Sequence, residues 1–325
     1  MEKPIIWIID EEWPDYELEK KMLLEKYPDC ELHFSTYDYA QDLENFGKKA
    51  DAIICQVYAP MPAETIHQLE KCKIIAVYGG GYDKVDTAAA KKKGIYVTNV
   101  SGYCAEDLSD YVMAAIFGFN KNFYDAKKAI QAGKWGAGAI EKKGKRLNVS
   151  TLFIVGCGTI GGLVAKKANA HQLRVIAYDP YLTKEELAAK GAEKVDSLEE
   201  GFMQADYVSV NAILTPETTG LIQYKHFQCM KPSVCIVNTA RGKVFVEEDF
   251  IRAEKEGLFK GAMLDVISAE PPAYTEEIFD CKRIMVTPHI SYISQDSFDE
   301  LKRRASTNVI TVLEGHEPRD WVNQW

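Results

Sequence analysis

Two kinds of hydrophobic pattern alternate along this chain. Short, almost wholly apolar runs, such as IIWIID at residues 5–10 and DAIICQVY at residues 51–58, are typical of strands buried on both faces of a parallel sheet. Between such runs lie segments with apolar residues at helical spacing, such as YELEKKMLLEKY at residues 16–27, which stops before Pro28. Strands that alternate with helices in this way predict parallel sheets covered by helices.

The alternation falls into two blocks. The first runs from residue 3 to about residue 99, with strands expected at residues 5–10, 30–37, 51–58, 73–79 and 94–99. The second runs from about residue 145 to residue 288, with strands expected at residues 152–155, 174–178, 206–212, 233–240, 261–267 and 283–288. A last long amphipathic helix is expected at residues 295–314. The predicted fold is therefore α/β, with two doubly wound parallel-sheet domains.

A further helix is expected within residues 101–123, between the two blocks. Its apolar side chains recur at helical spacing and are Leu108, Val112, Ala115, Ile116, Phe119 and Phe123. Such a stripe is usually part of the core, and here it is also a surface that a second subunit could cover.

Charge and length narrow the class of protein. The chain has 325 residues, enough for two domains, and a formal net charge of −9 without any basic run, which argues against nucleic acid or an anionic membrane as partner. No apolar run approaches the ~20 residues of a membrane span. The start of the chain, MEKPIIWIIDEEW, is too short and too acidic for a signal peptide. We therefore expect a cytoplasmic protein.

The cysteines give no sign of a disulfide or a metal site. All eight are scattered, none forms a C-x-x-C pair, and several, such as Cys55, lie inside apolar runs. We expect reduced core residues and no metal.

Residues 151–181 contain the clearest ligand-binding pattern. Gly156, Gly158 and Gly161 follow the apolar run at residues 152–155 with G-x-G-x-x-G spacing. Gly156 suits the tight turn out of the strand, Gly158 lets a pyrophosphate approach the helix N-terminus, and Gly161 lets helix and strand pack closely. Such glycines can also serve packing alone, but the surrounding strand–helix–strand context favours a dinucleotide.

Asp179 indicates which dinucleotide is bound. It closes the next strand, at residues 174–178, about 20 residues past the glycines, where a carboxylate can accept both ribose hydroxyls. Because this carboxylate would repel a 2′-phosphate, we predict NAD and not NADP.

A second glycine-rich turn lies in the first block. Gly79, Gly80 and Gly81 follow the strand at residues 73–79 and expose successive backbone N–H groups that could receive a small carboxylate. A plain tight turn is the alternative.

Three polar residues follow strands of the second block. Arg241, Glu270 and His289 come after the strands at residues 233–240, 261–267 and 283–288. Each alone fits a structural role, as an ion pair, a solvated acid or a core histidine. Ligands of open α/β sheets bind outside the carboxyl ends of strands, however, so their joint placement favours a site.

The trio suits hydride transfer between nicotinamide and a 2-oxo or 2-hydroxy acid. His289 can exchange the hydroxyl proton near neutral pH, and Glu270 can fix its tautomer and favour the imidazolium. Arg241 provides a permanent positive charge for the substrate carboxylate and for the charge on its C2 oxygen.

Together, these features resemble the D-isomer-specific 2-hydroxyacid dehydrogenase family, and the resemblance covers nearly the whole chain. The matching motifs are GGGYDKVD, VGCGTIGG with Asp179, LTPETTGLI, MKPSVCIVNTARG, LDVISAEPP and TPHI. The resemblance implies Arg241, Glu270 and His289 as catalytic residues and the Gly79–Gly81 backbone as carboxylate clamp.

The resemblance also implies a domain arrangement, an assembly and a set of NAD contacts. It places a Rossmann NAD-binding domain, residues 101–289, inside a flavodoxin-like substrate domain, residues 1–100 and 290–325. It implies a homodimer built around the helix after residue 100. The expected cofactor contacts are Gly156, Gly158, Thr159, Ile160, Gly161, Asp179, Asn211, Ala212, Thr215, Thr239, Ala240, Arg241 and Asp265.

Several positions depart from the family's motifs. Residues 211–215 read Asn-Ala-Ile-Leu-Thr where His-x-Pro-Leu-Thr is common, and Leu108 replaces a frequent threonine. After His289, Ser291 and Tyr292 replace glycines, which would narrow the substrate site.

The substrate is expected to be small and unphosphorylated. The loop CQVYAPM has no arginine to bind a phosphate, and Val57, Tyr58 and Tyr78 suggest an apolar or aromatic wall. Glu270 argues against a formate dehydrogenase, because relatives of that type carry glutamine at this position.

Two functions fit these motifs. One is an NAD-dependent reductase of a small 2-oxo acid, with a D-2-hydroxy acid as product. The other is a non-enzymatic NADH-binding regulator like the C-terminal-binding-protein co-repressors, which keep the same trio. The lack of long appended tails and of basic runs favours the enzyme. Which acid is used, and in which direction, stays open.

Overall fold

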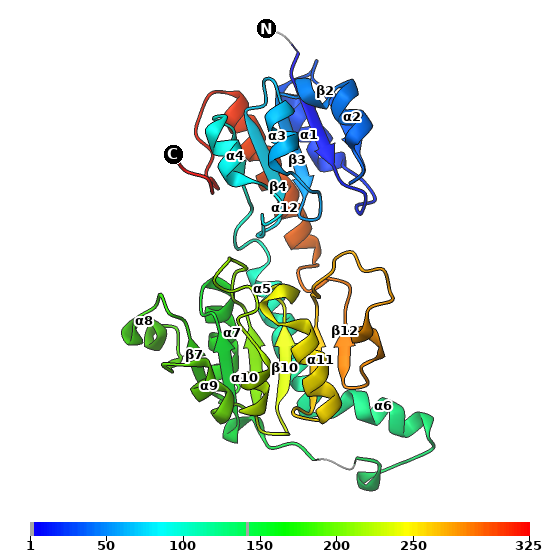
Figure 1. The fold of residues 1–325 in the computed structure, drawn as a ribbon, viewed down its shortest axis with the longest axis vertical. Coiled ribbons are helices and arrows are strands. Elements are labelled where there is room, and N and C mark those ends of the chain that lie inside the picture. Colours follow the sequence, from blue (N-terminus) through cyan, green and yellow to red (C-terminus); the bar gives the residue numbers. More distant parts are fainter. Residues whose placement is uncertain (1–2, 141–142) are drawn as a thin grey trace. The chain divides into compact units, whose positions relative to one another are not determined.

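The computed structural model describes residues 3–140 and 143–325. The chain divides into two compact units: unit 1 comprises Met1–Tyr103 with Ser294–Trp325, and unit 2 comprises Cys104–Ile293. In Figure 1, unit 1 holds the blue and cyan elements together with the red end of the chain, and unit 2 holds the green to orange elements. Each unit is built on a parallel sheet, so the predicted fold class is confirmed.

Unit 1 contains a five-stranded parallel sheet in the order β2-β1-β3-β4-β5. Its elements are β1 (Ile5–Ile9), α1 (Glu17–Lys26), β2 (Glu31–Ser35), α2 (Ala40–Asn45), β3 (Ala52–Gln56), α3 (Ala63–Gln68), β4 (Ile74–Tyr78), α4 (Thr87–Lys92), β5 (Tyr96–Thr98) and α12 (Gln295–Leu313). Helices α1 and α12 cover one face through Leu23, Leu301 and Val309, and α2, α3 and α4 cover the other. The C-terminal helix α12 therefore packs on the sheet that the N-terminal part of the chain forms.

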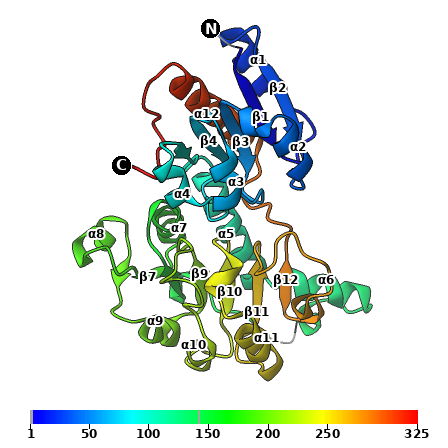
Figure 2. The same ribbon diagram turned by 45° about the horizontal axis from the view of Figure 1, so that its top comes forward.

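Unit 2 contains a seven-stranded parallel sheet in the order β12-β11-β10-β9-β6-β7-β8. Its elements are α5 (Ala105–Asn120), α6 (Phe123–Gln131), β6 (Thr151–Val155), α7 (Thr159–Ala170), β7 (Arg174–Tyr178), α8 (Lys184–Ala189), β8 (Glu193–Lys194), α9 (Leu198–Gln204), β9 (Tyr207–Val210), α10 (Tyr224–Gln228), β10 (Cys235–Asn238), α11 (Glu247–Glu256), β11 (Gly261–Leu264) and β12 (Ile284–Val286). Figure 2 shows β9, β10, β11 and β12 side by side, with β7 beyond them. The strand order reverses at β6, and such a switch point is where open α/β sheets bind ligands.

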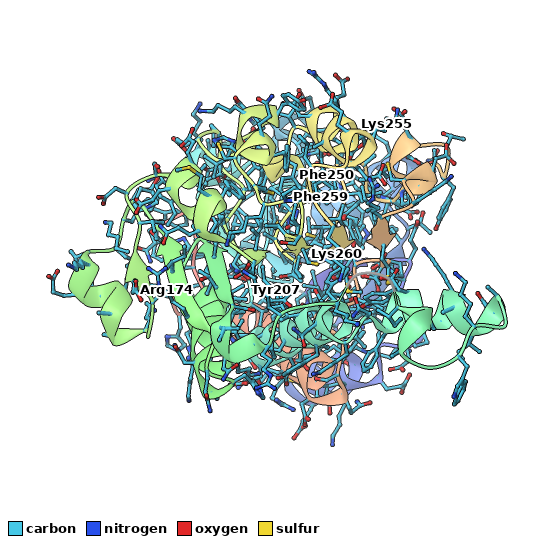
Figure 3. All side chains as sticks on the ribbon, turned by 90° about the horizontal axis from the view of Figure 1, so that it is seen from below. Arg174, Tyr207, Phe250, Lys255, Phe259 and Lys260 are labelled. Carbon is cyan, nitrogen blue, oxygen red and sulfur yellow. The ribbon has the colours of Figure 1, made fainter. Side chains whose placement is uncertain are left out.

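Both faces of the unit 2 sheet carry apolar cores. Helices α5, α7 and α8 pack on one face, and α9, α10 and α11 pack on the other. In the core under α9, α10 and α11, the rings of Phe250 and Phe259 stack with centroids 5.1 Å apart (Figure 3). A fully buried side chain of this kind contributes roughly 1.5–3 kcal/mol, so the two layers fix the strands on which the site is built.

The apolar stripe of α5 belongs to the core of unit 2. Val112, Ile116 and Phe119 are buried and pack with α7. Phe123, by contrast, lies at the start of α6 and is 62% exposed. Other side chains of unit 2 therefore cover the apolar stripe of α5. Exposed apolar side chains are found beyond the end of this helix, beginning with Phe123.

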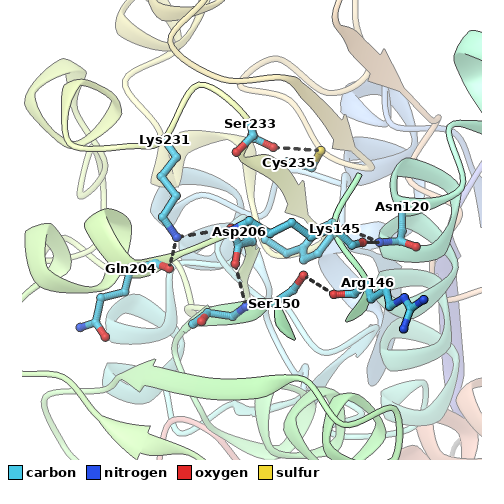
Figure 4. Close-up of polar contacts among 11 residues, drawn as sticks. Asn120, Lys145, Arg146, Ser150, Gln204, Asp206, Lys231, Ser233 and Cys235 are labelled. Carbon is cyan, nitrogen blue, oxygen red and sulfur yellow. Dashed lines mark hydrogen bonds and ion pairs between the residues drawn. The ribbon is translucent and has the colours of Figure 1, made fainter. Parts of the chain in front are cut away.

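A buried carboxylate anchors the amino ends of β6 and β9 (Figure 4). Asp206 accepts the N–H of Thr151 at 3.0 Å and hydrogen bonds from Lys145 Nζ at 2.9 Å and Lys231 Nζ at 3.3 Å. Burial alone would raise the pKa of Asp206, but these donors and positive charges outweigh it and lower the pKa. This cluster lies at the opposite end of the strands from Arg241, Glu270 and His289.

None of the helices in the described part of the chain has both the length and the apolar character needed to cross a membrane.

Candidate active site

Three neighbouring strands bring the predicted catalytic residues to one edge of the unit 2 sheet. Strands β10, β11 and β12 are adjacent and parallel. Arg241 follows β10, Glu270 lies in the loop after β11, and His289 follows β12. Since all three strands run the same way, all three residues follow carboxyl ends, as the sequence pattern predicts.

His289 and Glu270 form a direct pair. His289 Nδ1 lies 3.1 Å from Glu270 Oε2, and both side chains are largely buried. Glu270 Oε1 accepts the N–H of Ile267 at 2.9 Å, which fixes the orientation of the carboxylate. A carboxylate bound to Nδ1 favours the tautomer with its proton on that nitrogen.

Arg241 is held where the loops after β10 and β11 meet. Its guanidinium donates from Nη1 to the carbonyl oxygen of Ala240 at 2.9 Å, and its own carbonyl oxygen accepts from Asn238 Nδ2 at 3.1 Å. The next residue, Gly242, packs so closely that a Cβ would lie 1.9 Å from the carbonyl carbon of Ile267. Only glycine allows this approach, which brings the Arg241 loop against the Glu270 loop. The sequence reasoning missed Gly242.

The glycine turn after β6 has the geometry that a dinucleotide requires. Gly156 has φ 84°, and a Cβ there would lie 2.8 Å from Ala212 Cα. A Cβ on Gly161 would lie 2.2 Å from the carbonyl oxygen of Gly156, so the start of α7 packs tightly on the turn. A Cβ on Gly158, by contrast, would meet nothing within 4 Å. Two glycines serve packing, and the third opens space at the helix N-terminus.

Asp179 lies against this turn. Its Oδ2 accepts the N–H of Cys157 at 2.9 Å, and its Oδ1 accepts the N–H of Tyr181 at 3.0 Å. The carboxylate is thereby held beside the glycines at the end of β7. Burial raises the pKa of the Cys157 thiol to about 11, so this side chain stays neutral beside the glycine turn.

Two buried acceptors at the predicted cofactor site lack partners. Asn211 Oδ1 and Thr239 Oγ1 are buried without a hydrogen bond to any described residue. Asn211 follows β9 and Thr239 follows β10, the strands beside β6. Buried polar atoms normally have partners, so each one that lacks a partner needs an explanation, and a bound ligand is one such explanation. With the open space at Gly158, the two acceptors leave unused hydrogen-bonding capacity and room for NAD at these strand ends.

The remaining predicted cofactor residues lie around the same strand ends. Thr159 and Ile160 form the first turn of α7, Ala212 packs on Gly156, and Ala240 precedes Arg241. The Thr215 hydroxyl is occupied within its own turn, because Thr215 Oγ1 accepts the N–H of Thr218 at 3.3 Å.

Asp265, another predicted cofactor residue, already accepts several hydrogen bonds from the protein itself. Its carboxylate accepts from Thr287 Oγ1, which precedes His289, and from the N–H groups of Ile290 and Ser291, which follow His289. It therefore holds the segment that carries His289.

In unit 1, the glycine-rich loop leaves β4 with its carbonyl groups fixed. The carbonyl oxygen of Gly79 accepts the N–H of Val100 at 2.7 Å, and that of Gly80 accepts from Asn99 Nδ2 at 2.8 Å. The N–H groups of Gly80 and Gly81 donate to no residue that the structure describes. Gly79 has φ 148°, and a Cβ there would lie 2.4 Å from Val57 Cγ1, so Val57 packs under the loop.

The expectation that Tyr78 forms part of an aromatic wall is corrected. Its side chain is 1% exposed and lies in the core between the sheet and helices α1 and α12. The hydroxyl donates to Glu19 Oε1 at 2.9 Å. Burial and this carboxylate raise the pKa of Tyr78 far above its usual range, so it remains a neutral core residue.

Comparison with known proteins identifies the family. Residues 113–291 match the family model described as D-isomer specific 2-hydroxyacid dehydrogenase, NAD binding domain. The glyoxylate reductase of Thermococcus litoralis is 33% identical over 282 residues, which cover 85% of this chain and 85% of that relative. The chain belongs to the D-isomer-specific 2-hydroxyacid dehydrogenase family, as its motifs predict.

Solved structures agree over almost the whole chain. The D-lactate dehydrogenase from Aquifex aeolicus, complexed with NAD and lactic acid, is 25% identical, with a TM-score of 0.86 and coverage of 99% of each chain. The D-mandelate dehydrogenase of Rhodotorula graminis, in a holo form, is 28% identical, with a TM-score of 0.85 and coverage of 100% of this chain and 99% of that chain. The protein is thus an NAD-dependent 2-hydroxyacid dehydrogenase, and the predicted enzyme class and cofactor are confirmed.

Proposed function

We propose that this enzyme interconverts a small, unphosphorylated 2-oxo acid and its D-2-hydroxy acid, with His289 as general acid and base. The observation that carries the proposal is the His289–Glu270 pair, with Nδ1 and Oε2 3.1 Å apart, at the same sheet edge as Arg241. This edge also carries the glycine turn and Asp179 of the cofactor site.

Proton transfer is assigned to His289 Nε2, because the Glu270 carboxylate engages Nδ1. When NADH is bound, its nicotinamide supplies the hydride that C2 of the oxo acid receives. In that direction His289 gives a proton to the C2 oxygen, and in the reverse direction it removes the hydroxyl proton. Glu270 stabilises the imidazolium and keeps the ring in place, supported by its own bond to Ile267.

Arg241 is assigned to the substrate's carboxylate and to the developing charge on its C2 oxygen. A guanidinium suits both tasks because it stays charged and presents several donors in one plane. In unit 1, the N–H groups of Gly80 and Gly81, which donate to no described residue, are assigned to a small carboxylate.

The proposed substrate class rests on one feature of each unit and on the names of relatives. The loop after β3 carries Val57 and Tyr58 and no arginine, which disfavours a phosphorylated acid. The ring of Tyr292 meets that of His289 edge to face, with centroids 6.1 Å apart, and its bulk disfavours large substrates near the catalytic ring. A glyoxylate reductase and a D-lactate dehydrogenase among the relatives are named for such small acids.

A panel of 2-oxo acids tests this function against the regulator alternative. NADH oxidation is followed with pyruvate, glyoxylate, hydroxypyruvate, 4-methyl-2-oxopentanoate and phenylpyruvate, and with phosphohydroxypyruvate as the phosphorylated control. We expect turnover with at least one unphosphorylated acid and little with the phosphorylated one. Clear NADH binding without turnover of any acid would favour a non-enzymatic NADH-binding regulator.

Asp179 is expected to set the preference for NADH over NADPH. Its carboxylate lies beside the glycine turn, where it would repel a 2′-phosphate. In wild-type enzyme kcat/KM should favour NADH by about 10² or more, and Asp179→Asn should reduce this ratio at least about tenfold. Asp196→Asn, an exposed acid of the same unit, is the control. Equal use of both cofactors by the wild type would show that Asp179 does not face the ribose.

The predicted homodimer is proposed to form through α6 and not through the apolar stripe of α5. Figure 1 shows α6 at the edge of unit 2, and it carries Phe123 and Ile130, which are 62% and 56% exposed, while Trp135 just beyond it is 87% exposed. A groove of about 860 Å³ lies between this segment and the start of β11 and β12. It is lined by apolar residues such as Tyr124, Ile284 and Met285 and by the basic residues Lys127, Lys128, Lys134, Lys260, Lys282 and Arg283. Exposed apolar side chains beside a groove are typical of a subunit interface.

Charged substitutions on this segment are expected to separate the subunits. Trp135→Glu combined with Ile130→Glu should weaken the dimer at least about tenfold, because each would place a charge in an apolar contact. Light scattering after size exclusion measures the mass. Ile213→Glu, at another exposed apolar residue of unit 2, should leave the mass unchanged. A monomeric wild type would contradict the proposal.

A further inference from the structure

A carboxylate that the proposed mechanism does not use holds the loop that carries Glu270. Glu247, the first residue of α11, accepts the N–H of Ser268 through Oε2 at 3.0 Å. Ser268 lies just before Glu270, in the loop that follows β11. This hydrogen bond therefore joins α11 to the loop on which the carboxylate partner of His289 lies.

A close packing contact reaches the same peptide group. A Cβ on Gly242 would lie 1.9 Å from the carbonyl carbon of Ile267, 2.2 Å from its oxygen and 2.4 Å from the nitrogen of Ser268. These three atoms belong to one peptide group, whose N–H donates to Glu247. The peptide between Ile267 and Ser268 is therefore held by packing against Gly242 and by a hydrogen bond to Glu247.

The segment that makes both contacts is well anchored in unit 2. The N–H of Ile222 donates to the carbonyl oxygen of Val244 at 3.0 Å, and the N–H of Val246 donates to the carbonyl oxygen of Ile222 at 3.0 Å. The side chains of Val244 and Phe250 are buried in the core. Glu247 thus lies on a fixed part of the unit and can impose its position on a loop.

The loop itself has fewer supports. Residues 266–276 form neither a helix nor a strand. A small cavity of about 10 Å³, lined among others by Gly242, Glu247 and Ile267, lies beside it, so side chains do not fill this side of the loop completely. The N–H of Ile267 donates to Glu270 Oε1 at 2.9 Å. The catalytic carboxylate therefore takes its orientation from the stretch of backbone that Glu247 holds.

We propose that Glu247 is a positioning residue for Glu270. By accepting the N–H of Ser268, it fixes the backbone from which Glu270 reaches His289 Nδ1. The segment that ends at Glu247 begins at Arg241, so the contact also ties the loop of the substrate cation to the loop of the acid–base pair. The inference rests on the proposed role of His289 as acid and base.

Glu247→Ala is the main test. It removes the acceptor and leaves the Ser268 N–H without this partner, so the loop can shift and Glu270 loses part of its hold on His289. We expect kcat with the best oxo acid of the panel to fall about tenfold, while the Kd for NADH, measured by fluorescence titration, stays within about threefold of wild type. Glu248→Ala, at the exposed neighbour in the same helical turn, should behave as wild type.

A conservative variant separates the hydrogen bond from the charge. Glu247→Gln keeps a side-chain oxygen that can accept the Ser268 N–H but removes the negative charge. Because the proposal depends on the hydrogen bond, this variant should keep most of the wild-type kcat. Equal losses in Glu247→Gln and Glu247→Ala would overturn the proposal in favour of a purely electrostatic effect.

The pH profile gives a readout that a loss of stability would not produce. The groups seen to face His289 are Glu270 from the loop after β11 and Tyr292 from its own segment, while Asp265 binds the backbone of the same turn. Of these, Glu270 is the one whose loop Glu247 holds. A displaced Glu270 favours the imidazolium less, so the fall of kcat/KM for the oxo acid at high pH should begin at lower pH in Glu247→Ala than in wild type. Glu270→Gln should shift it further in the same direction.

A double variant decides whether Glu247 acts through Glu270. In a Glu270→Gln background, Glu247→Ala should reduce kcat by less than about twofold, because the contact that it supports is already lost. The same loss in both backgrounds would overturn the proposal, and so would a lowered melting temperature as the sole effect of Glu247→Ala. Full turnover by His289→Asn would instead refute the proposed function on which the inference rests.

Discussion

Replacing His289 by asparagine is expected to reduce kcat for the reduction of a 2-oxo acid by about 10²- to 10⁴-fold, the usual contribution of a general acid. Asparagine cannot give the C2 oxygen a proton near neutral pH. It also tolerates the left-handed conformation, φ 53°, that His289 adopts, so the turn should survive the change. Steady-state kinetics at saturating NADH measures the loss.

A second histidine provides the matched control. His226 on α10 also faces a carboxylate, with Nε2 3.4 Å from Glu199 Oε1, but it lies away from the carboxyl ends of β10, β11 and β12. His226→Asn should leave kcat nearly unchanged, whatever it does to stability. If the two variants had equal activity, the acid would have to be sought elsewhere in the chain.

Replacing Arg241 by lysine is expected to lower kcat/KM for the oxo acid by about 10²- to 10³-fold, as when one donor to a developing oxyanion is lost. Lysine keeps the charge but not the planar set of donors that can reach two oxygens together. Much of the loss should appear in KM, because we assign Arg241 to the substrate carboxylate in the ground state as well. NADH binding, measured by fluorescence, should change little.

Arg174→Lys is the control for this substitution. Arg174 also presents its guanidinium to a carboxylate, with Nη2 2.6 Å from Glu193 Oε2, but on the exposed edge formed by β7 and β8 (Figure 3). Its replacement should not affect kcat/KM. A similar loss in both arginine variants would point to stability rather than substrate binding, and wild-type kinetics in Arg241→Lys would remove Arg241 from the proposed site.

Much of the fold is predictable because buried parallel strands are continuous apolar runs. Strands β3 and β4 are wholly buried, and both stand out in the sequence as short hydrophobic segments. Helix α6 was not predicted, because its apolar residues Phe123 and Ile130 are not buried in its own unit. A pattern that reports burial within a unit misses such a helix.

The misjudged side chain, Tyr78, shows a different limit. Successive residues of a strand face opposite sides of the sheet, so Tyr78 lies on the same side as Ile74 and Ala76, under α1. Its position at the end of β4 suggested a ligand wall. The decisive partner, Glu19, lies on a helix far away in the sequence, and no local pattern reveals that contact.

The candidate site shows the same division. The strand-end rule correctly predicted that Arg241, Glu270 and His289 follow neighbouring strands. It could not show that Gly242 packs the Arg241 loop onto Ile267, nor that the Asp265 carboxylate is already occupied. Both features depend on contacts between loops that are far apart in the sequence. These loops lie close together because their strands are neighbours in the sheet.

The chirality of the product tests the central claim most directly. Wild-type enzyme is incubated with NADH and pyruvate or 4-methyl-2-oxopentanoate, chosen from the panel because their products are chiral, and the hydroxy acid is analysed by chiral chromatography. We predict that the D-hydroxy acid forms in step with NADH oxidation and that His289→Asn forms almost none. Formation of the L-hydroxy acid, or undiminished formation of the D-acid by His289→Asn, would contradict the account.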